Sequence, residues 1–309
     1  MPVNVFVTGT IRSGTTFVGR ALASADNCIY LHEPFNPDSP WNAAIPTPIN
    51  HFYISEHNAK IYEGRFNSLL KLRPAIKGKW LESHRQERTE YIEKAIPKGL
   101  SRENLNIIIK DPIALFCTEW LADRWGLKPV LVVRDPRDVV NSIFRLSWAK
   151  NLQPMFLRTQ PLLVRRLKEM EEQLGLSKCI STEFSEDNLT TVIRYLKPSY
   201  LALLYFARIS KFQMLCYERS TLQPDVEFLR LFDDLSIPMS DTFKSSLSKA
   251  TNTFDASRTH QNTYAPVSVK RIKQLRDDTE DLPAVDDKII IDAFAEIRSG
   301  FAQLVDWWE

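Results

Sequence analysis

The chain has 309 residues, of which 44% are hydrophobic, so it is long enough to bury a sizeable core in one or two domains. Its 40 lysines and arginines nearly balance its 38 aspartates and glutamates, and a formal charge of +2 gives no reason to expect a nucleic-acid partner. No apolar run approaches the ~18 residues of a spanning helix, and no signal-peptide pattern opens the chain, so we expect neither a membrane span nor a leader.

Five short apolar runs are predicted to form buried strands: VNVFV at 3–7, CIYL at 28–31, NIIIK at 106–110, PVLVV at 129–133 and FQMLCY at 212–217. Apolar positions at helical spacing predict helices over 14–24, 112–125, 135–147, 187–210, 225–235, 240–250 and 286–305. Continuous apolar strands that alternate with helices indicate a parallel sheet covered on both faces. We therefore expect an α/β fold, a single domain over 1–309 with a central parallel sheet of these five strands flanked by helices.

Two polar segments interrupt this alternation, at about 34–105 and 151–186. The first begins rich in proline and then turns basic, with Lys60, Arg65, Lys71, Arg73, Lys77 and Lys79 opposed by Glu63 alone. It is either a solvated insertion or a cover over a pocket, because long ordered insertions in compact domains often form lids. We expect both segments to cover the site where an acceptor binds.

The four cysteines, at 28, 117, 179 and 216, are widely spaced and form no C-x-x-C pair. Three of them have apolar neighbours. This distribution is typical of buried free thiols in a reducing compartment, so we expect a cytoplasmic protein.

The stretch VFVTGTIRSGTTFVGRAL at 5–22 has the outline of a phosphate-binding loop between a strand and a helix. Backbone N–H groups at a helix N-terminus attract an anion. Gly14 lies in the loop, Ser13, Thr15 and Thr16 add hydroxyl donors, and Arg12 adds a positive charge with a planar fork of donors. The alternative is a glycine- and threonine-rich turn that only links the strand to the helix.

Thr15 stands where the phosphate-binding loops of ATP and GTP enzymes carry a lysine. That lysine reaches the β- and γ-phosphates, and the next hydroxyl holds Mg²⁺. A ligand without a γ-phosphate does not need it. The loop therefore predicts a single phosphate that carries a transferable group, bound through Arg12 with no obligatory metal.

A second motif, LVVRDPRDVVNSIFRL, occupies 131–146. Arg134 follows a predicted strand at its carboxyl end, where open α/β sheets bind ligands. Asp135 suits the N-cap of the next helix, and Ser142 lies two helical turns further on. Taken alone, Arg134 is better explained by a surface ion pair with Asp135 or Asp138.

Together the two motifs resemble those of the sulfotransferases that use 3′-phosphoadenosine 5′-phosphosulfate (PAPS). TIRSGTT is similar to the 5′-phosphosulfate loop of that family, and VVRDPRDVVNS is similar to its 3′-phosphate motif. MLCYERS at 214–220 resembles the family's strand that ends in Tyr-Glu, whose tyrosine lies near the adenine. YLHEP and IIIKDP stand where the family places acceptor-side catalytic groups. The resemblance covers about 3–235.

Within the family, RSGTT is nearest in style to the carbohydrate and protein-tyrosine branches. Small-phenol sulfotransferases tend to have a lysine in this loop, and they carry a catalytic histidine in a Lys-Thr-His run after the third strand. This chain has Lys110, Asp111 and Pro112 there, so that histidine is not carried over.

The resemblance implies transfer of the sulfuryl group of PAPS to a hydroxyl of a saccharide, lipid, peptide or other small molecule, without a metal. It implies donor binding by Arg12, Ser13, Gly14, Thr15, Thr16, Arg134, Ser142 and Tyr217, and catalysis by Glu33, Arg12 and Lys110. Two other functions are possible alternatives for a phosphate-binding loop of this kind. A phosphate-loop kinase is opposed by Thr15 and by the lack of a Mg²⁺-holding aspartate motif. A catalytically silent nucleotide-binding protein is opposed by the retained catalytic groups.

Sulfuryl transfer to a hydroxyl needs in-line approach, a base for the acceptor proton and cations on the leaving phosphate. Glu33 follows the second predicted strand, where the carbohydrate branch uses a glutamate as base. His32 is the rival, because its pKa suits the task, but successive strand residues point opposite ways, so only one can face the sulfate. Asp111 is a third candidate. The structural alternative for Glu33 is a carboxylate that caps a turn before Pro34.

The stretch DASRTHQNTYAPVSVKRIKQL at 255–275 has two interpretations. It is either a flap that closes over PAPS through Arg258 or the start of a surface helix.

Overall fold

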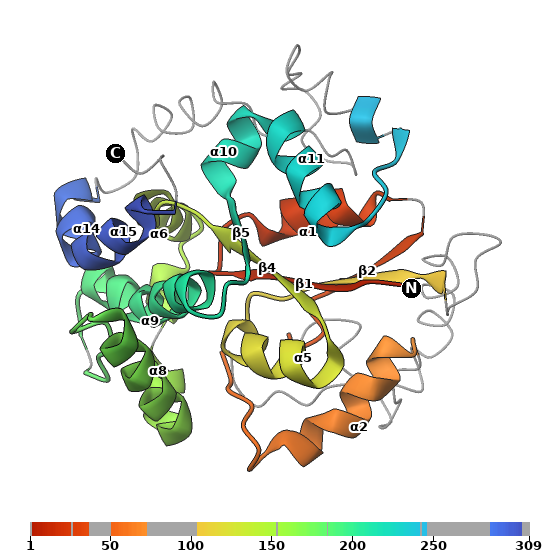
Figure 1. The fold of residues 1–309 in the computed structure, drawn as a ribbon. Coiled ribbons are helices and arrows are strands. Elements are labelled where there is room, and N and C mark those ends of the chain that lie inside the picture. The colour runs from red at the N-terminus through yellow and green to blue at the C-terminus, as the bar shows by residue number, and fades with distance from the viewer. Residues whose placement is uncertain are drawn as a thin grey trace.

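A sheet of five parallel strands forms the centre of the molecule, in the order β2-β3-β1-β4-β5 (Figure 1). The computed structural model describes residues 2–25, 27–36, 51–72, 104–152, 154–183, 185–241, 243–245 and 285–304. The strands are β1 (Asn4–Gly9), β2 (Cys28–His32), β3 (Asn106–Lys110), β4 (Lys128–Val133) and β5 (Gln213–Cys216). The predicted α/β fold is confirmed, and each predicted strand is present.

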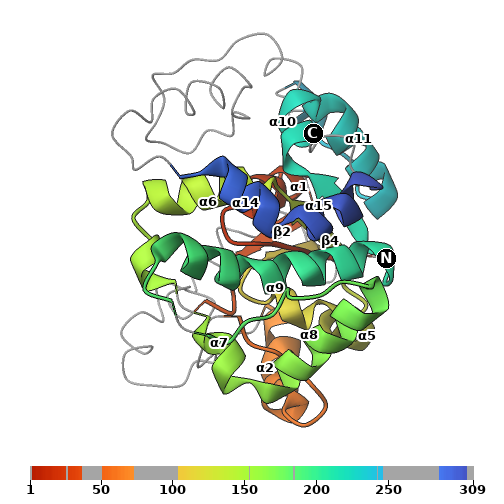
Figure 2. The same cartoon turned by 90° about the vertical axis from the view of Figure 1, so that its left-hand side faces the viewer.

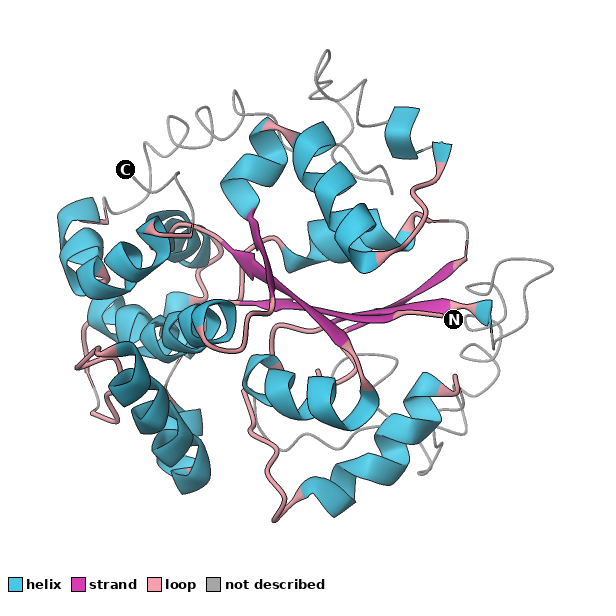
Figure 3. Ribbon diagram, in the orientation of Figure 1, coloured by secondary structure: helices cyan, strands magenta, loops and turns pink. Residues whose placement is uncertain are grey.

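Helices cover both faces of the sheet, as Figure 3 shows by colour. They are α1 (Thr15–Ala23), α2 (Ala59–Leu70), α5 (Thr118–Trp125), α6 (Pro136–Arg145), α7 (Met155–Thr159), α8 (Pro161–Leu174), α9 (Asn188–Arg208), α10 (Tyr217–Leu222), α11 (Pro224–Leu235), α14 (Asp287–Ala293) and α15 (Ala295–Ala302). Two short 3₁₀ turns are η3 (Leu115–Cys117) and η4 (Ala149–Asn151).

Alternate residues of β1 enter different core layers, which is why the strand is apolar along its whole length. Val5 and Val7 pack with residues of α1 and α11 on one face. Phe6 packs with residues of α2 and α5 on the other. A third apolar cluster lies beyond β4, around the long helix α9. Figure 2 shows α9 crossing that side of the molecule, with α14 and α15 above it and α7 and α8 below it.

Several predicted boundaries differ from the structure. The strand predicted over 212–217 ends at Cys216, and Tyr217 opens α10 instead. The helix predicted over 286–305 is broken at Phe294 into α14 and α15. The helix predicted from 112 begins only at Thr118, after the 3₁₀ turn η3.

The insertion predicted at about 34–105 contains a helix of its own, α2, whose residue Phe66 is buried against the sheet. The remainder of that insertion, at 37–50 and 73–103, lies outside the described residues. So do 246–250 of the helix predicted over 240–250, and the whole 255–275 stretch with Arg258.

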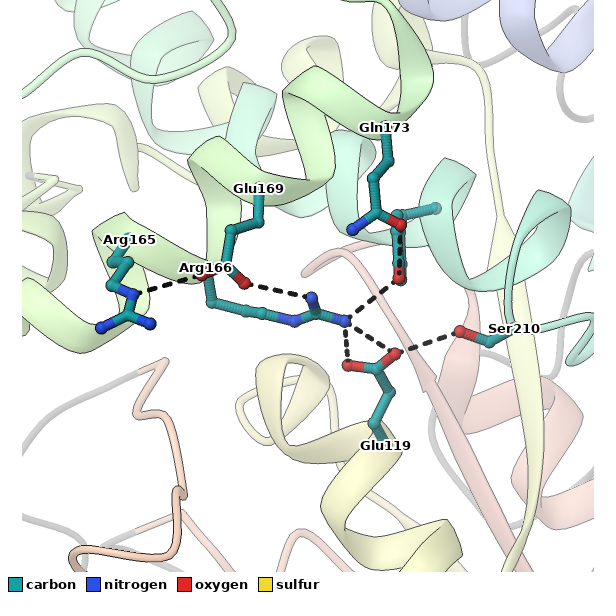
Figure 4. Close-up of polar contacts among 7 residues, drawn as sticks. Glu119, Arg165, Arg166, Glu169, Gln173 and Ser210 are labelled. Atoms are coloured by element: carbon teal, nitrogen blue, oxygen red, sulfur yellow. Dashed lines mark hydrogen bonds and ion pairs between the residues drawn. The ribbon is translucent and has the colours of Figure 1, made fainter.

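The second insertion is anchored by an ion-pair network around Arg166 of α8 (Figure 4). Its Nη2 donates to Glu119 Oε2 of α5 at 2.8 Å and to the hydroxyl of Tyr205 on α9 at 3.2 Å. Glu119 also accepts from Ser210 at 3.2 Å. The network thereby joins α5 to α8 and α9, which come later in the sequence.

The four cysteines are buried and form no disulfide, as expected. Within the described part of the chain, no helix is both long and apolar enough to cross a membrane.

Candidate active site

The carboxyl ends of all five strands surround one cavity of about 830 Å³. This is the edge at which open parallel sheets bind ligands, and the volume is in the usual range for a small-molecule site. The lining residues are Ile11, Arg12, Gly14, Thr15, Thr16, Phe17, Glu33, Asn36, His51, Lys110, Pro112, Ile113, Arg134, Trp148, Leu152, Tyr195 and Tyr217.

The loop after β1 brings its backbone close to an aromatic ring. Gly14 is the N-cap of α1 with φ of 93°, a conformation that favours glycine. A Cβ at this position would lie 2.2 Å from Cδ2 of Tyr217, so no side chain fits between the loop and the ring. Thr15 and Thr16 follow at the first turn of α1 and line the cavity. The packing of the loop against Tyr217 therefore requires a glycine at position 14.

Ser13 departs from the prediction that its hydroxyl faces an anion. Its side chain is buried, and its Oγ donates to the carbonyl of Thr10 at 2.8 Å within the loop. The backbone N–H of Ser13 points to the same carbonyl at 3.3 Å. Ser13 therefore fixes the turn, and the hydroxyls that line the cavity beside Gly14 belong to Thr15 and Thr16.

Two arginines from separate loops meet beside this turn. Nη1 of Arg134 donates to the carbonyl of Arg12 at 3.1 Å, and Nε of Arg12 donates to Oγ of Ser142 at 3.1 Å. The Arg134 guanidinium lies 4.7 Å from the ring centroid of Tyr217, and that of Arg12 lies 5.4 Å from the ring of Trp148. Burial, and then the charge of Arg134, lower the pKa of Arg12, although an arginine stays protonated in proteins.

Arg134 has donor capacity left over. Its Nε is buried and has no hydrogen-bond partner among the described residues. Asp135, one of the two aspartates expected to pair with it, instead binds Arg137 at 2.7 Å and caps α6. That alternative for Asp135 is therefore wrong. A buried guanidinium N–H without an acceptor is suited to an anionic ligand.

Neighbouring elements hold the Arg134 loop in place. The hydroxyl of Tyr200 on α9 donates to the Arg134 carbonyl at 2.6 Å. The backbone N–H of Asp135 donates to Oε1 of Glu218 on α10 at 2.8 Å. The arginine side chain therefore projects from a backbone that is fixed on both sides.

Glu33 and Lys110 lie at the ends of adjacent strands and form an ion pair. The Lys110 ammonium donates to Oε1 of Glu33, while Nδ2 of Asn36 donates to Oε2 at 2.6 Å. Glu33 has φ of 47°, which turns the chain sharply after β2. Burial alone would raise the pKa of Glu33, but the charge and hydrogen bond of Lys110, together with Asn36, lower it below its usual value. The carboxylate is therefore ionised at neutral pH.

The two rival bases occupy different surroundings. His32 does not line the cavity in the described part of the chain, and its Nδ1 lies 3.1 Å from the hydroxyl of Tyr30. Asp111 is fully buried, and its carboxylate accepts from the backbone N–H groups of Phe35 at 2.7 Å and Ile113 at 2.9 Å. Burial raises the pKa of Asp111 to about 7. Asp111 ties two loops together, while Glu33 faces the cavity.

Several lining residues are absent from the sequence prediction, notably His51, Trp148, Leu152 and Tyr195. Asn36 is absent from it too; it stands three residues after Glu33, and its backbone N–H donates to the Glu33 carbonyl at 2.9 Å. The others come from loops and from α9, and no strand end or glycine-rich pattern marks them.

No protein-family model matches the chain, and no curated protein matches it in sequence. Among solved structures, it is similar to a sulfotransferase domain from the curacin biosynthetic pathway, at 17% identity and a TM-score of 0.44 over 98% of both chains. It is also similar to the sulfotransferase domain of the Synechococcus PCC 7002 olefin synthase, at 13% identity and a TM-score of 0.46, over 97% of this chain and 94% of that one. Sulfotransferase STF1 from Mycobacterium tuberculosis H37Rv matches at 14% identity and a TM-score of 0.43, over 96% and 77%. At such identities, the chemistry is inferred from the chain's own residues.

Proposed function

We propose that this protein is a PAPS-dependent sulfotransferase that forms a sulfate ester on a hydroxyl of its acceptor. The observation that carries the proposal is the convergence of three features in one cavity. The first is a helix N-terminus without the lysine that binds the phosphates of nucleoside triphosphates. The others are two arginines from separate loops, and an ionised carboxylate paired with a lysine. Each has a role in sulfuryl transfer.

The residues in and beside the cavity are suited to bind PAPS, the sulfuryl donor. The backbone N–H groups at the start of α1 would bind the 5′-phosphosulfate, with Thr15 and Thr16 as hydroxyl donors. The unpartnered Nε of Arg134 suits the 3′-phosphate. Ser142 accepts from Arg12, which leaves its own hydroxyl proton free to donate to the same phosphate. Tyr217 would flank the adenine.

Glu33 is the base in this proposal. PAPS would supply the sulfuryl group, whose bond to the 5′-phosphate breaks as the acceptor oxygen binds sulfur. Glu33 removes the proton of that hydroxyl, and Lys110 and Arg12 stabilise the charge that develops on the departing phosphate. Asn36 fixes one carboxylate oxygen of Glu33, which orients the group before the acceptor arrives.

The two polar insertions would cover the acceptor side of the same domain. His51 and Asn36 of the first insertion, and Leu152 of the second, line the cavity. We infer that the acceptor hydroxyl approaches between these segments, opposite the loop that holds the donor.

The test is transfer of ³⁵S from labelled PAPS to a library of saccharides, phenols, lipids and peptides, with and without EDTA. We expect an EDTA-resistant labelled sulfate ester, because the donor has no triphosphate that requires Mg²⁺. Activity lost in EDTA and restored by Mg²⁺, or phosphate transfer from labelled ATP, would instead support a kinase. Tight binding of 3′-phosphoadenosine 5′-phosphate without turnover on any acceptor would support a silent binding protein.

A further inference from the structure

The imidazole of His51 is a buried polar group without a hydrogen bond. The residue is 1% exposed, and neither ring nitrogen has a partner among the described residues. His51 nevertheless lines the cavity that contains Glu33 and Lys110. Buried side-chain nitrogens are nearly always hydrogen-bonded, because leaving one unpaired costs about 1–3 kcal/mol. A ligand in the cavity is the natural source of the missing bonds.

Aromatic rings surround this histidine. Its ring centroid lies 5.2 Å from that of Phe156, 5.9 Å from that of Phe116 and 5.1 Å from that of Tyr195. Burial lowers the pKa of His51 to about 4, so the ring is neutral at pH 7. A neutral imidazole offers one N–H donor and one acceptor nitrogen. It therefore matches a hydroxyl or an amide better than a charged group.

The walls near His51 differ from the sheet edge in charge. The charged residues that line the cavity are Arg12, Glu33, Lys110 and Arg134, all at or just after the ends of β1 to β4. The aromatic rings packed around His51, those of Phe116, Phe156 and Tyr195, carry no charge. A buried carboxylate or ammonium against such walls would lack a counter-charge.

We propose that His51 and Tyr195 form a subsite for the acceptor that selects an uncharged molecule with an apolar or aromatic body. That molecule carries a second hydroxyl or amide, bound by His51, in addition to the hydroxyl that receives the sulfuryl group. The proposal rests on the proposed function, because it assigns this part of the cavity to the acceptor. It restricts the acceptor to molecules whose part beside His51 carries no charge.

Binding is measured first, without any sulfuryl donor. Protein labelled with ¹⁵N-histidine is titrated with benzene-1,4-dimethanol, with the longer biphenyl-4,4′-dimethanol, with 4-methylbenzyl alcohol and with 4-(hydroxymethyl)benzoate. The chain has five histidines, and the His51 ring signals are those that disappear in His51→Phe. His57→Gln, at an exposed position, is the matched control variant.

We expect at least one of the two diols to shift the His51 ring nitrogens and to bind His51→Phe about tenfold more weakly, the scale of one hydrogen bond. His51→Gln should retain part of the affinity, while 4-methylbenzyl alcohol should bind wild type and His51→Phe alike. The benzoate should bind more weakly than the diols. If neither diol binds, if both bind His51→Phe as well as wild type, or if the benzoate binds best, the subsite proposal is wrong.

Transfer of ³⁵S from PAPS to the diols is then assayed separately. Absence of transfer to any acceptor, with the His51 shifts and the affinity loss intact, would overturn the proposed function and leave the subsite standing. Transfer whose KM is the same in wild type and in a folded His51→Phe would overturn the subsite and leave the sulfotransferase standing.

Discussion

Lys110 and Glu33 are joined twice, once through their side chains and once through the backbone. The ammonium is ion-paired with Oε1 of Glu33, and the N–H of Glu33 donates to the carbonyl of Lys110 at 2.7 Å. The lysine side chain is only 3% exposed, so the pair is shielded from solvent. The position and the ionisation of the proposed base therefore both depend on Lys110.

Replacing the lysine should change the pH dependence of the reaction. In Lys110→Met, burial would act on Glu33 without the cation that lowers its pKa, so the pKa of Glu33 should rise. The acid limb of kcat should then move to higher pH than in wild type, in addition to a lower maximum. The measurement is kcat from about pH 4 to pH 8. Lys60→Met, at an exposed position of α2, is the control, and an unmoved acid limb would show that Lys110 does not set the ionisation of the base.

Removing the base should slow the chemical step without weakening the binding of the donor nucleotide. Glu33→Gln should lower the single-turnover rate by ~10²–10⁴, the usual span for a lost general base. Binding of 3′-phosphoadenosine 5′-phosphate should stay close to wild type. His32→Ala should lose much less, because its ring does not line the cavity in the described part of the chain. A severe defect in His32→Ala with Glu33→Gln near wild type would transfer the role to His32.

Recognition of the 3′-phosphate should depend on Arg134. Arg134→Ala should weaken the binding of 3′-phosphoadenosine 5′-phosphate by ~2–4 kcal/mol, because one partner of a charge-assisted pair is lost. Ser142→Ala should cost about 1 kcal/mol, the scale of one hydrogen bond. Calorimetry with adenosine 5′-phosphate is the control, since it lacks the 3′-phosphate and should bind each variant almost as it binds wild type. Equal weakening of both nucleotides would contradict the assignment.

The glycine of the loop can be tested against a matched position. Gly14 and Gly126 both have positive φ, at 93° and 62°, but a Cβ at Gly126 would meet nothing within 4 Å. Backbone strain of about 1–2 kcal/mol is therefore common to both alanine variants. Gly14→Ala should in addition displace Tyr217 and abolish measurable nucleotide binding, whereas Gly126→Ala should keep it. Equal nucleotide affinity in the two variants would mean that the Gly14–Tyr217 contact is unimportant for binding.

His51 should make the protein sensitive to acid. The pKa is lowered to about 4 in the folded state, so the unfolded chain binds a proton first as the pH falls below about 6.5. The stability due to neutral His51 is present above that pH and is lost between about pH 6.5 and pH 4, by up to about 3 kcal/mol. Asp111, whose pKa is raised to about 7, acts in the opposite direction.

The contribution of His51 is therefore measured as a difference. Urea unfolding of wild type and His51→Phe at pH 7 and pH 4.5 should show a smaller acid loss in the variant, because the Asp111 effect is common to both. An identical loss in the two proteins would mean that His51 is not the acid-sensitive group.

The strands, and the site residues at the carboxyl edge of the sheet, were predictable for one physical reason. Apolar runs such as NIIIK specify buried parallel strands, and such strands place Glu33, Lys110 and Arg134 at one edge whatever the loops do. The geometry within that edge was not predictable. The inward turn of the Ser13 hydroxyl depends on the carbonyl of Thr10, which only the folded loop presents.

The proposed acceptor side of the cavity had no comparable signal in the sequence. His51 belongs to an irregular segment, and Tyr195 is one of many apolar and aromatic residues on α9, nearly all of them buried. Their approach to one another depends on how the first insertion and α9 pack on the sheet, which is a tertiary property. Local patterns in the sequence cannot distinguish a tyrosine that faces a cavity from one that faces the core.

The strand order has a consequence for when the site forms during folding. β1 lies between β3 and β4, so its hydrogen bonds await segments about a hundred residues later, and Tyr217 arrives only with β5. Pairing between strands so distant in sequence makes folding slow, so the loop after β1 meets Tyr217 only late in folding. We expect a refolding chain to acquire nucleotide affinity only in its last kinetic phase, so that fluorescence of a bound adenine analogue appears after most helical signal has returned. Nucleotide added to the native protein should protect the amide protons of all five strands together, because no partly folded form would retain the ligand.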